Sequence, residues 1–386
     1  MRLKDRFTFL IFALSVLFIL AALPAQAAQE DRIDRLEKEV DGLKKENEAL
    51  KDRVDAVEAE GEEVKHGVGT LSRLVEVSGY ADAEFTFTDN EGENNRFRIR
   101  HLSLFFTKDI QKEWKLFTEI EFEDAPRIES NTASDTVNKS QGTLFVEQMY
   151  IEYHPQVTWD LRVGRLLTPA GIWSIYHYPP YVPTQTGPLF YKVIFPEVTD
   201  GVQLRNSFTI KDSALDTHLY VANGGGNPGR IDRNQNKAVG LRVNYGLLGG
   251  VSAGASYYRE KDNSDVMRNS YGVHLLVNYG PSLRLQAEYA LRHNKPEGAD
   301  RFYDKGLYAL AAYDIGRWTV AGRYDWYDEN SSDPQKDQFR YTGALNYHFA
   351  HNVIGKAEYS KYVFDDPSKK DFNEFIMAIV VAIGDL

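Results

Sequence analysis

The sequence predicts an all-β transmembrane barrel of about 16 antiparallel strands, preceded by an α-helical coiled coil. Three observations favour this fold class. Aromatic residues make up 13% of the chain, yet its mean hydropathy is only -0.45. After the N-terminus the apolar residues alternate with polar ones in segments of about ten to fourteen residues, which suits strands tilted across a membrane. Short and long connections follow one another, as at the two rims of a barrel.

The first 27 residues are predicted to be a signal peptide. A basic start precedes an apolar run from Phe7 to Leu23, and Ala25-Gln26-Ala27 supplies the small-x-small pattern of a cleavage site. An uncleaved membrane anchor is the alternative. Cleavage after Ala27 removes three bases and one acid, so the formal charge moves from -11 to -13. Such an acidic chain is a poor candidate for binding nucleic acid.

The chain has no cysteine, which excludes a disulfide scaffold, a thiol nucleophile and covalent attachment of haem through a C-x-x-C-H motif. An exported chain of this size without disulfides must be held together in another way. The apolar residues are spread singly among polar neighbours, and alternation along strands is the way to bury them.

Residues 28–66 are predicted to form a periplasmic coiled-coil stalk. The a positions are Ile33, Val40, Asn47 and Val54, and the d positions are Leu36, Leu43, Leu50 and Val57. All four g-to-e pairs of a parallel assembly are attractive, and Gly61 ends the seam after a helix roughly 45 Å long. A solvated single helix, or a tail packed on the domain, is the alternative. The a-position Asn favours two chains, whereas the barrel behind it favours three.

The barrel domain is predicted over residues 75–386, with an apolar and a polar face on each strand. In one strand Trp318 and Val320 oppose Thr319 and Arg323, and in another Leu285 opposes Gln286. The predicted strands are 75–88, 95–108, 113–124, 142–155, 158–167, 200–210, 215–223, 236–246, 250–261, 268–280, 282–293, 305–315, 317–328, 337–350, 353–365 and 371–385. Their even number places both termini on the periplasmic side.

The connection after the fifth predicted strand, residues 168–199, is the longest and is rich in Pro and Tyr. It is too long and too aromatic for a simple hairpin link. We therefore expect it to fold inward and narrow a pore.

The polar faces of the strands carry many bases, which we expect to line the lumen and to favour anions. Glu119, Glu121 and Glu123 are the acids that we expect to lie beside the first three bases and pair with them. The predicted pore-lining residues are Arg96, Arg98, Arg100, Glu119, Glu121, Glu123, Arg162, Arg165, Arg205, Arg242, Arg284, Arg292, Arg323, Arg340 and Lys356. Pairing that merely braces the wall is the alternative.

Signals for catalysis or for a cofactor are weak. Gly224-x-Gly226-x-x-Gly229 matches a dinucleotide fingerprint, but Pro228 and the polar residues after it provide no helix to bind a pyrophosphate. The nine histidines show no spacing typical of a metal site. Acidic loops such as "DNEGEN" are expected to be solvated, and contact with divalent ions at the outer leaflet is the alternative. No catalytic residue, cofactor or metal is predicted.

Three stretches carry a family resemblance: "RFRIRHLSLFFTKDIQKEWKLFTEIEFED" (96–124), "LRVGRLLTPAGIW" (161–173) and "DGVQLRN" (200–206). They resemble the phosphate-selective porin O and P family of outer-membrane porins. The resemblance implies a sixteen-stranded barrel, usually trimeric, with an inward loop and a pore lined by bases. It matches Arg96, Arg98, Arg100 and Arg165 to basic positions, and Pro169 and Gly171 to the loop entry.

Taken together, these features predict an outer-membrane porin that lets small polar solutes, and anions such as phosphate preferentially, diffuse through a water-filled barrel. The expected partners are the outer-membrane bilayer, small inorganic or organic anions, further copies of the chain (a trimer favoured over a dimer) and the cell wall as a contact of the stalk. Two alternatives remain: a barrel sheath around an electron-conducting cytochrome, and an outer-membrane hydrolase.

Overall fold

The computed structural model describes residues 75–125, 128–130, 137–139, 142–211, 213–225, 235–247, 249–333 and 335–384. They belong to one compact unit that begins at Val75. The predicted signal peptide (1–27) and coiled-coil stalk (28–66) lie outside the described residues.

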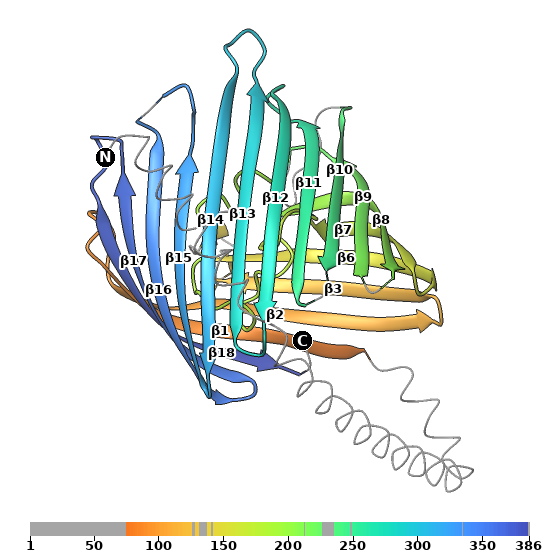
Figure 1. Ribbon diagram of the computed structural model, residues 1–386, viewed down its shortest axis with the longest axis horizontal. Coiled ribbons are helices and arrows are strands. Elements are labelled where there is room, and N and C mark those ends of the chain that lie inside the picture. Colours follow the sequence, from red (N-terminus) through yellow and green to blue (C-terminus); the bar gives the residue numbers. More distant parts are fainter. Residues whose placement is uncertain are drawn as a thin grey trace, which may run out of the picture. The chain divides into compact units, whose positions relative to one another are not determined.

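Sixteen antiparallel strands form a closed barrel, in which β1 pairs with both β2 and β18 (Figure 1). All sixteen predicted strands are present, and their ends lie within three residues of the predicted ones. The barrel strands are β1 (Glu76–Thr88), β2 (Arg96–Gln111), β3 (Trp114–Glu123), β6 (Thr143–Gln156), β7 (Trp159–Leu167), β8 (Val198–Ile210), β9 (Ser213–Asn223), β10 (Lys237–Leu247), β11 (Val251–Lys261), β12 (Met267–Tyr279), β13 (Leu283–Lys295), β14 (Phe302–Ile315), β15 (Trp318–Asp328), β16 (Asp337–Ala350), β17 (Val353–Phe364) and β18 (Phe372–Ile383).

Two short strands that the sequence did not predict, β4 (Ile128–Ser130) and β5 (Val137–Lys139), pair with each other in the connection between β3 and β6. They form a sheet of their own, apart from the barrel order. The long connection after β3 thus contains a pair of short antiparallel strands.

The two faces of each strand meet different surroundings, as the alternation predicts. Trp318 and Val320 are 45% and 47% exposed on the outer face of β15, whereas Arg323 and Asp325 of the same strand are buried. Because neighbouring strands pair in register, Val320 lies beside Leu345 of β16 and Arg323 lies beside Thr342. The outer face is therefore apolar and suited to lipid, and the inner face is polar.

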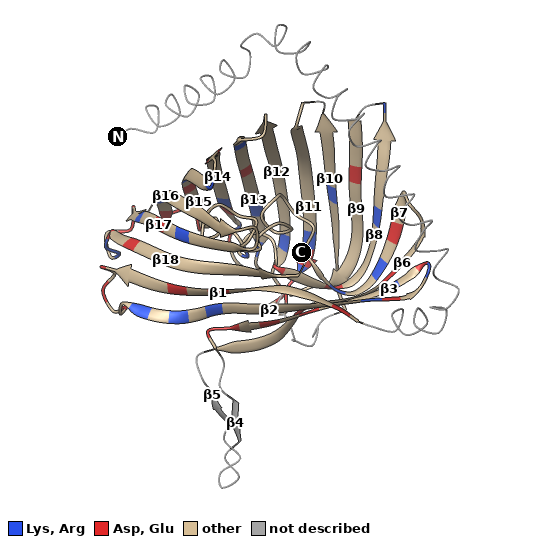
Figure 2. Ribbon diagram, turned by 90° about the horizontal axis from the view of Figure 1, so that it is seen from below, with Lys and Arg blue, Asp and Glu red and all other residues tan. Residues whose placement is uncertain are grey.

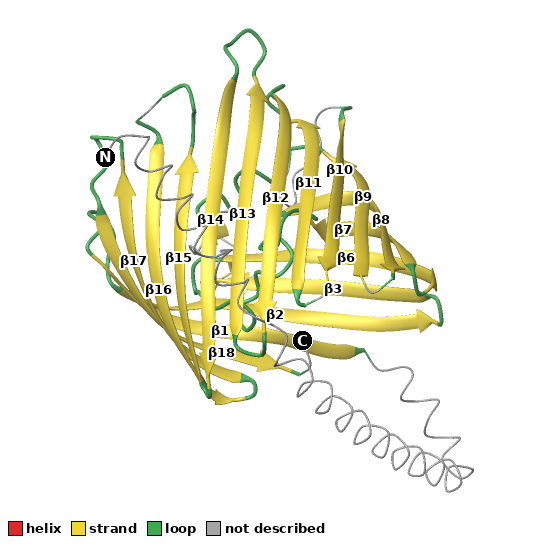
Figure 3. Ribbon diagram, viewed as in Figure 1, coloured by secondary structure: helices red, strands yellow, loops and turns green. Residues whose placement is uncertain are grey.

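The connections confirm the predicted alternation of short and long links. β14 and β15 are joined by two residues, Gly316 and Arg317, and Gly316 has a φ of +63°, which glycine adopts at little cost. By contrast, residues 168–197 join β7 to β8 without regular structure, and we call this segment the inner loop. Figure 3 shows such loop segments in green within the ring of strands.

The inner loop folds into the barrel as predicted. Its side chains Trp173, Phe190, Ile194 and Phe195 belong to the buried apolar cluster. The wall makes room for them with small residues: a Cβ added to Gly306 of β14 would lie 2.4 Å from the Cβ of Phe190. The apolar core of the described unit is thus formed where this loop packs against the inner face of the wall.

No helix in the described part of the chain is long and apolar enough to cross a membrane.

Candidate functional site

Bases of the inner wall hold the backbone of the inner loop. Lys356 Nζ donates to the carbonyl oxygens of Pro179 at 2.7 Å and Val182 at 2.8 Å. Arg242 Nε donates to the carbonyl of Gly171 at 3.0 Å. The remaining bases of this set act in the same way: Arg284 donates to the Tyr181 carbonyl, Arg292 to that of Val193, and Arg340 to that of Gly187. Loop carbonyls thereby gain charged donors, and those buried against the wall, such as that of Gly171, are satisfied.

Arg323 of β15 makes the largest set of these contacts. Its guanidinium donates to Thr184 Oγ1 and to the Thr186 carbonyl, both at 2.5 Å, and lies 5.4 Å from the ring centre of Trp173. It also pairs with Asp325 at 2.9 Å. Neither partner of this pair has an exposed side chain, so the ion pair is buried where the inner loop packs on the wall.

Carboxylates of the wall accept hydrogen bonds from backbone amides of the loop and from one of its hydroxyl groups. Glu358 accepts hydrogen bonds from the Gln185 backbone nitrogen and from Thr186 Oγ1, each at 2.5 Å. Glu288 accepts from the Trp173 backbone nitrogen at 2.8 Å. The loop is therefore held by basic donors and by acidic acceptors of the wall, and β13 and β17 each supply both kinds.

The first three predicted bases lie on β2 but do not pair with the predicted acids. Arg98 Nε binds Glu84 of β1 at 2.7 Å, and Arg100 binds the same carboxylate at 3.4 Å. Arg96 is exposed at the start of the strand. The expected pairing with Glu119, Glu121 and Glu123 is therefore wrong. The physical reason is register, which sets those acids beside Phe105, Ser103 and His101 instead.

Glu119 and Glu121 are buried and bind neutral donors. Glu119 accepts from Ser103 Oγ and Gln148 Nε2, both at 2.7 Å. Glu121 accepts from Tyr80 Oη at 2.7 Å. The acids of β3 thus form a cluster of their own under the inner loop.

The other predicted bases form ion pairs along the wall. Arg162 binds Glu152 at 2.6 Å, and Arg205 lies 3.4 Å from Asp160. Arg165, next to the start of the inner loop, binds Asp200 at 2.7 Å. Figure 2 shows the charged residues of the barrel as short blue and red bands along the strands.

Sequence reasoning missed Glu147, which alternation along β6 would place on the lipid side between Val146 and Gln148. The pairing of β3 with β6 skips this residue, so Glu147 sits in a β-bulge. The bulge turns its side chain inward, where it is only 1% exposed. The sequence offered one sign of this bulge, which is that regular alternation would place a carboxylate on an otherwise apolar outer face.

Two hollows lie beside the inner loop. One, of about 280 Å³, is lined by Arg100, Glu121, Glu123, Gln185 and Lys192. The other, of about 400 Å³, is lined by Asp160, Arg205, Asp216, His218 and Arg242. Both are bounded by charged groups of the inner wall, as the interior of a water-filled channel would be.

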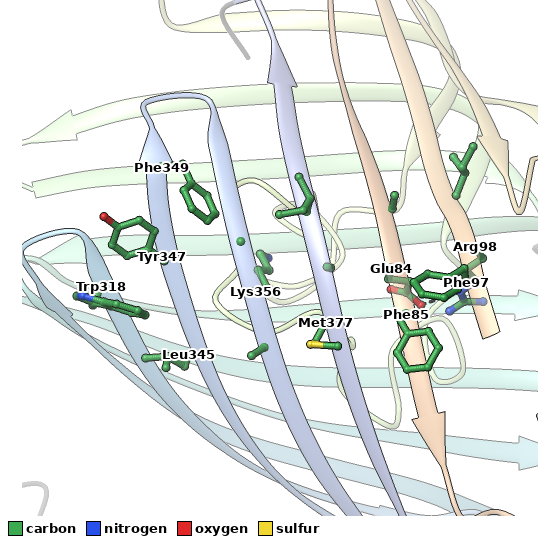
Figure 4. Close-up of a pocket in the computed structure, with 16 residues that line it drawn as sticks. Glu84, Phe85, Phe97, Arg98, Trp318, Leu345, Tyr347, Phe349, Lys356 and Met377 are labelled. Atoms are coloured by element: carbon green, nitrogen blue, oxygen red, sulfur yellow. Dashed lines mark hydrogen bonds and ion pairs between the residues drawn. The ribbon is translucent and has the colours of Figure 1, made fainter. Parts of the chain in front are cut away.

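A larger groove of about 740 Å³ lies on the outer surface, where it has no part in a pore. Trp318, Tyr347 and Phe349 line one side of it, and Phe85 and Phe97 line the other (Figure 4). Because these side chains are aromatic and face outward, the groove belongs to the surface that meets lipid or another barrel.

A model of Gram-negative porins matches residues 13–367. The chain belongs to the Gram-negative porin family. This family match and the closed barrel place the porin in the outer membrane and give it the architecture of a channel.

Solved structures support the same fold at low sequence identity. The porin is similar to the anion-selective porin from Comamonas acidovorans, with a TM-score of 0.59 and 14% identity over 80% of this chain and 99% of that one. It is also similar to the trimer form of OmpT from Vibrio cholerae, with a TM-score of 0.57 and 14% identity over 80% and 99% of the two chains. The channel DcaP of Acinetobacter baumannii gives a TM-score of 0.53 at 13% identity, over 80% and 97%.

One curated relative, an uncharacterized protein of Aquifex aeolicus, is 29% identical over 126 residues, which are 33% of this porin. The match spans 27% of that relative's length.

Proposed function

We propose that this porin lets small polar solutes diffuse passively across the outer membrane, with a preference for anions. The inner loop narrows the lumen, and solutes pass through the hollow between that loop and the wall formed by β1, β2 and β3. Copies of the chain assemble as a homo-oligomer, as the trimer form of OmpT does. The coiled-coil stalk over residues 28–66 would join the protomers in the periplasm.

The anion preference is carried by one observation: within most ion pairs of the inner wall, the base is more exposed than the acid. The side chain of Arg98 is 21% exposed and that of its partner Glu84 is 0% exposed. Arg205 is 35% exposed and Asp160 is 16%. Two pairs reverse the order: Arg165 with Asp200, at 18% and 39%, and Arg98 with Asp124, at 21% and 41%. Water in the lumen thus meets more guanidinium than carboxylate, which lowers the barrier for anions.

The phosphate preference that the family resemblance implies is a narrower proposal. The inner loop contributes a single lysine, Lys192, which pairs with Glu197. The wall arginines therefore have to bind any phosphate, and Arg100 and Arg205 are the candidates because each lines a hollow. Arginine suits this task because its planar donors match phosphate oxygens.

The proposal gives the barrel no catalytic role and no cytochrome. Charged groups of the inner wall bind the loop or each other, and the loop occupies the lumen that a cytochrome would need. Haem that co-purifies with the protein would favour the sheath instead.

The test is the reversal potential of the purified full-length protein in a planar bilayer under a tenfold KCl gradient. We expect the sign for chloride preference, and we expect Arg100→Gln and Arg205→Gln each to move the potential toward cations. Both changes leave the partner acid with a second base, Arg98 or Arg162, so the fold should survive. Arg301→Gln, at an exposed site, is the matched control. Cation preference of the unaltered protein would refute the selectivity and leave the pore standing.

Addition of phosphate to the chloride bath tests the narrower claim. Phosphate that binds in the pore should reduce the chloride current in a concentration-dependent way, and Arg100→Gln should weaken this block. A chloride current that phosphate leaves unchanged would show a general anion pore.

A further inference from the structure

Two overlapping groups of potential metal ligands lie where the inner loop meets β3 and β6. In the first, carboxylate oxygens of Glu119, Glu121 and Glu147 lie within 4.8 Å of one another. In the second, Glu147 shares the same spacing with His177 and Glu197, which belong to the inner loop. Glu147 is common to both groups, so a single carboxylate joins the wall to the loop.

This cluster is buried. Glu119, Glu121 and Glu147 are 0%, 3% and 1% exposed. Carboxylates packed together away from water repel one another and are costly to keep charged, unless a cation or protons neutralise them. Lys192 pairs with Glu197. Among the described residues, no other lysine or arginine forms an ion pair with Glu197 or with the three buried glutamates. One ammonium does not balance the four carboxylates.

Three atoms in the cluster have no hydrogen-bond partner in the described structure. They are Glu147 Oε2, His177 Nδ1 and Glu197 Oε1, the last of which forms an ion pair with Lys192. His177 Nε2 faces the other oxygen of Glu147 at 3.3 Å, and its side chain is 10% exposed. A buried carboxylate oxygen without a donor is uncommon, because such groups are almost always satisfied. Glu147 therefore lacks a partner that a cation would supply.

The bulge at Glu147 gives this site its geometry. Regular pairing would have placed the side chain on the lipid side, and the extra residue in β6 turns it toward the loop instead. Donor atoms that share one ion at about 2.1 Å lie roughly 3 to 4 Å apart, so the observed spacing needs only small side-chain adjustments.

We propose that Glu147, His177 and Glu197 bind a divalent first-row transition metal ion, with Glu121 as a further ligand. The bound ion ties the inner loop to the wall at β6. An imidazole among carboxylates suits Zn²⁺ or Mn²⁺, whereas Ca²⁺ takes six to eight oxygen ligands. Lys192 competes with the ion for Glu197. Glu119 is already satisfied by Ser103 and Gln148 and helps to hold the cluster together.

The experiment uses the full-length, tag-free protein in detergent, stripped with EDTA and then titrated with ZnCl₂ and MnCl₂ in separate calorimetric runs. We expect one ion per chain, and at least about tenfold weaker binding in Glu147→Gln and in His177→Gln. Glu260→Gln alters another buried acid of the inner wall and is the matched control, which should bind as the unaltered protein does.

X-ray absorption at the zinc edge supplies a second readout. One imidazole among oxygen ligands is expected, and its signal should vanish in His177→Gln. His177 lies in the loop and not in a strand, so this variant keeps the test open even if Glu147→Gln does not assemble. No binding of either ion by the unaltered protein would overturn the proposal and leave shared protons to neutralise the acids. Binding that both variants retain would place the ion elsewhere and would also overturn it.

Discussion

Arg323 shows how a side chain that sequence patterning assigns to the pore comes to serve the loop. Alternation places it on the inner face, and this placement is confirmed by its 3% exposure beneath the loop. Its donors are consumed by Thr184, Thr186 and Asp325. Such a base cannot meet a passing anion directly, so its effect on the pore runs through the loop that it holds.

We predict that Arg323→Met destabilises the folded barrel by about 3 kcal/mol, because removal of one partner from a buried ion pair leaves uncompensated polar groups. Asp325 keeps Arg340 at 3.1 Å, which limits the loss. Denaturant unfolding in detergent measures the change, and Arg301→Met at an exposed site should leave the midpoint unaltered. Equal midpoints for the two variants would contradict the assigned role.

At the scale of a strand, small inner residues decide where the loop can sit. Gly306 leaves room for the ring of Phe190, and Gly272 leaves room for that of Phe195. The aromatic side chains of the loop therefore pack against the wall at glycines, where the wall has no side chain.

We predict that Gly306→Ala costs about 1–3 kcal/mol, since the new methyl group would overlap Phe190 in a filled space. The displaced loop should also change the single-channel conductance. Gly343→Ala is the control, because a Cβ at Gly343 of β16 meets no atom within 4 Å. A Gly306→Ala protein with the stability and conductance of the control would show that the loop does not rely on this seat.

The outer face of a strand tolerates different residues from the inner face, because it meets lipid. Leu285 of β13 lies beside Val277 and Ala311 on the lipid side, and Gln286 lies on the inner side with Glu288. We predict that Leu285→Arg costs about 2–4 kcal/mol or blocks assembly, because it puts a charge into lipid. Gln286→Arg should be tolerated. Refolding yields in the reverse order would show that the faces of this strand are misassigned.

At the scale of the whole molecule, the field in the lumen is what remains after local pairing. Most wall charges have a partner, so the selectivity rests on the exposed ends of the bases. We predict that the anion preference weakens at high salt, because screening shortens the reach of these charges to about 3 Å at 1 M. Reversal potentials over a series of KCl concentrations, each at the same ratio across the bilayer, measure this. A preference that does not change with salt would point to a binding site in place of a field.

The proposed stalk is tested by deletion of residues 28–66. We predict a barrel that still folds in detergent and associates more weakly, because the heptads and their attractive flanking pairs are lost. Light scattering measures the oligomer mass. An unchanged mass would show that the stalk is not needed, and a monomeric full-length protein would remove the stalk from the proposal.

The sequence by itself determined the barrel. The period of two is a local property of each strand, and the spacing of turns is local too, so sixteen strands, their faces and the inward loop could be read from the chain before any pairing was known. The identities of inward residues such as Arg242 and Lys356 followed from the same period.

Only the tertiary structure decided which partners these residues meet. The register of the strands sets Arg98 and Arg100 beside Glu84 of β1. Glu121 instead accepts a hydrogen bond from Tyr80. The bulge at Glu147 is visible only once β3 and β6 are paired, because the pairing shows that Glu147 has no partner on β3. The extra residue turns this side chain from the outer face to the inner face. The contacts between the inner loop and distant strands depend on how the loop side chains fit the space left by the wall side chains. The residues that determine this fit are spread along the whole chain, so no single segment predicts it.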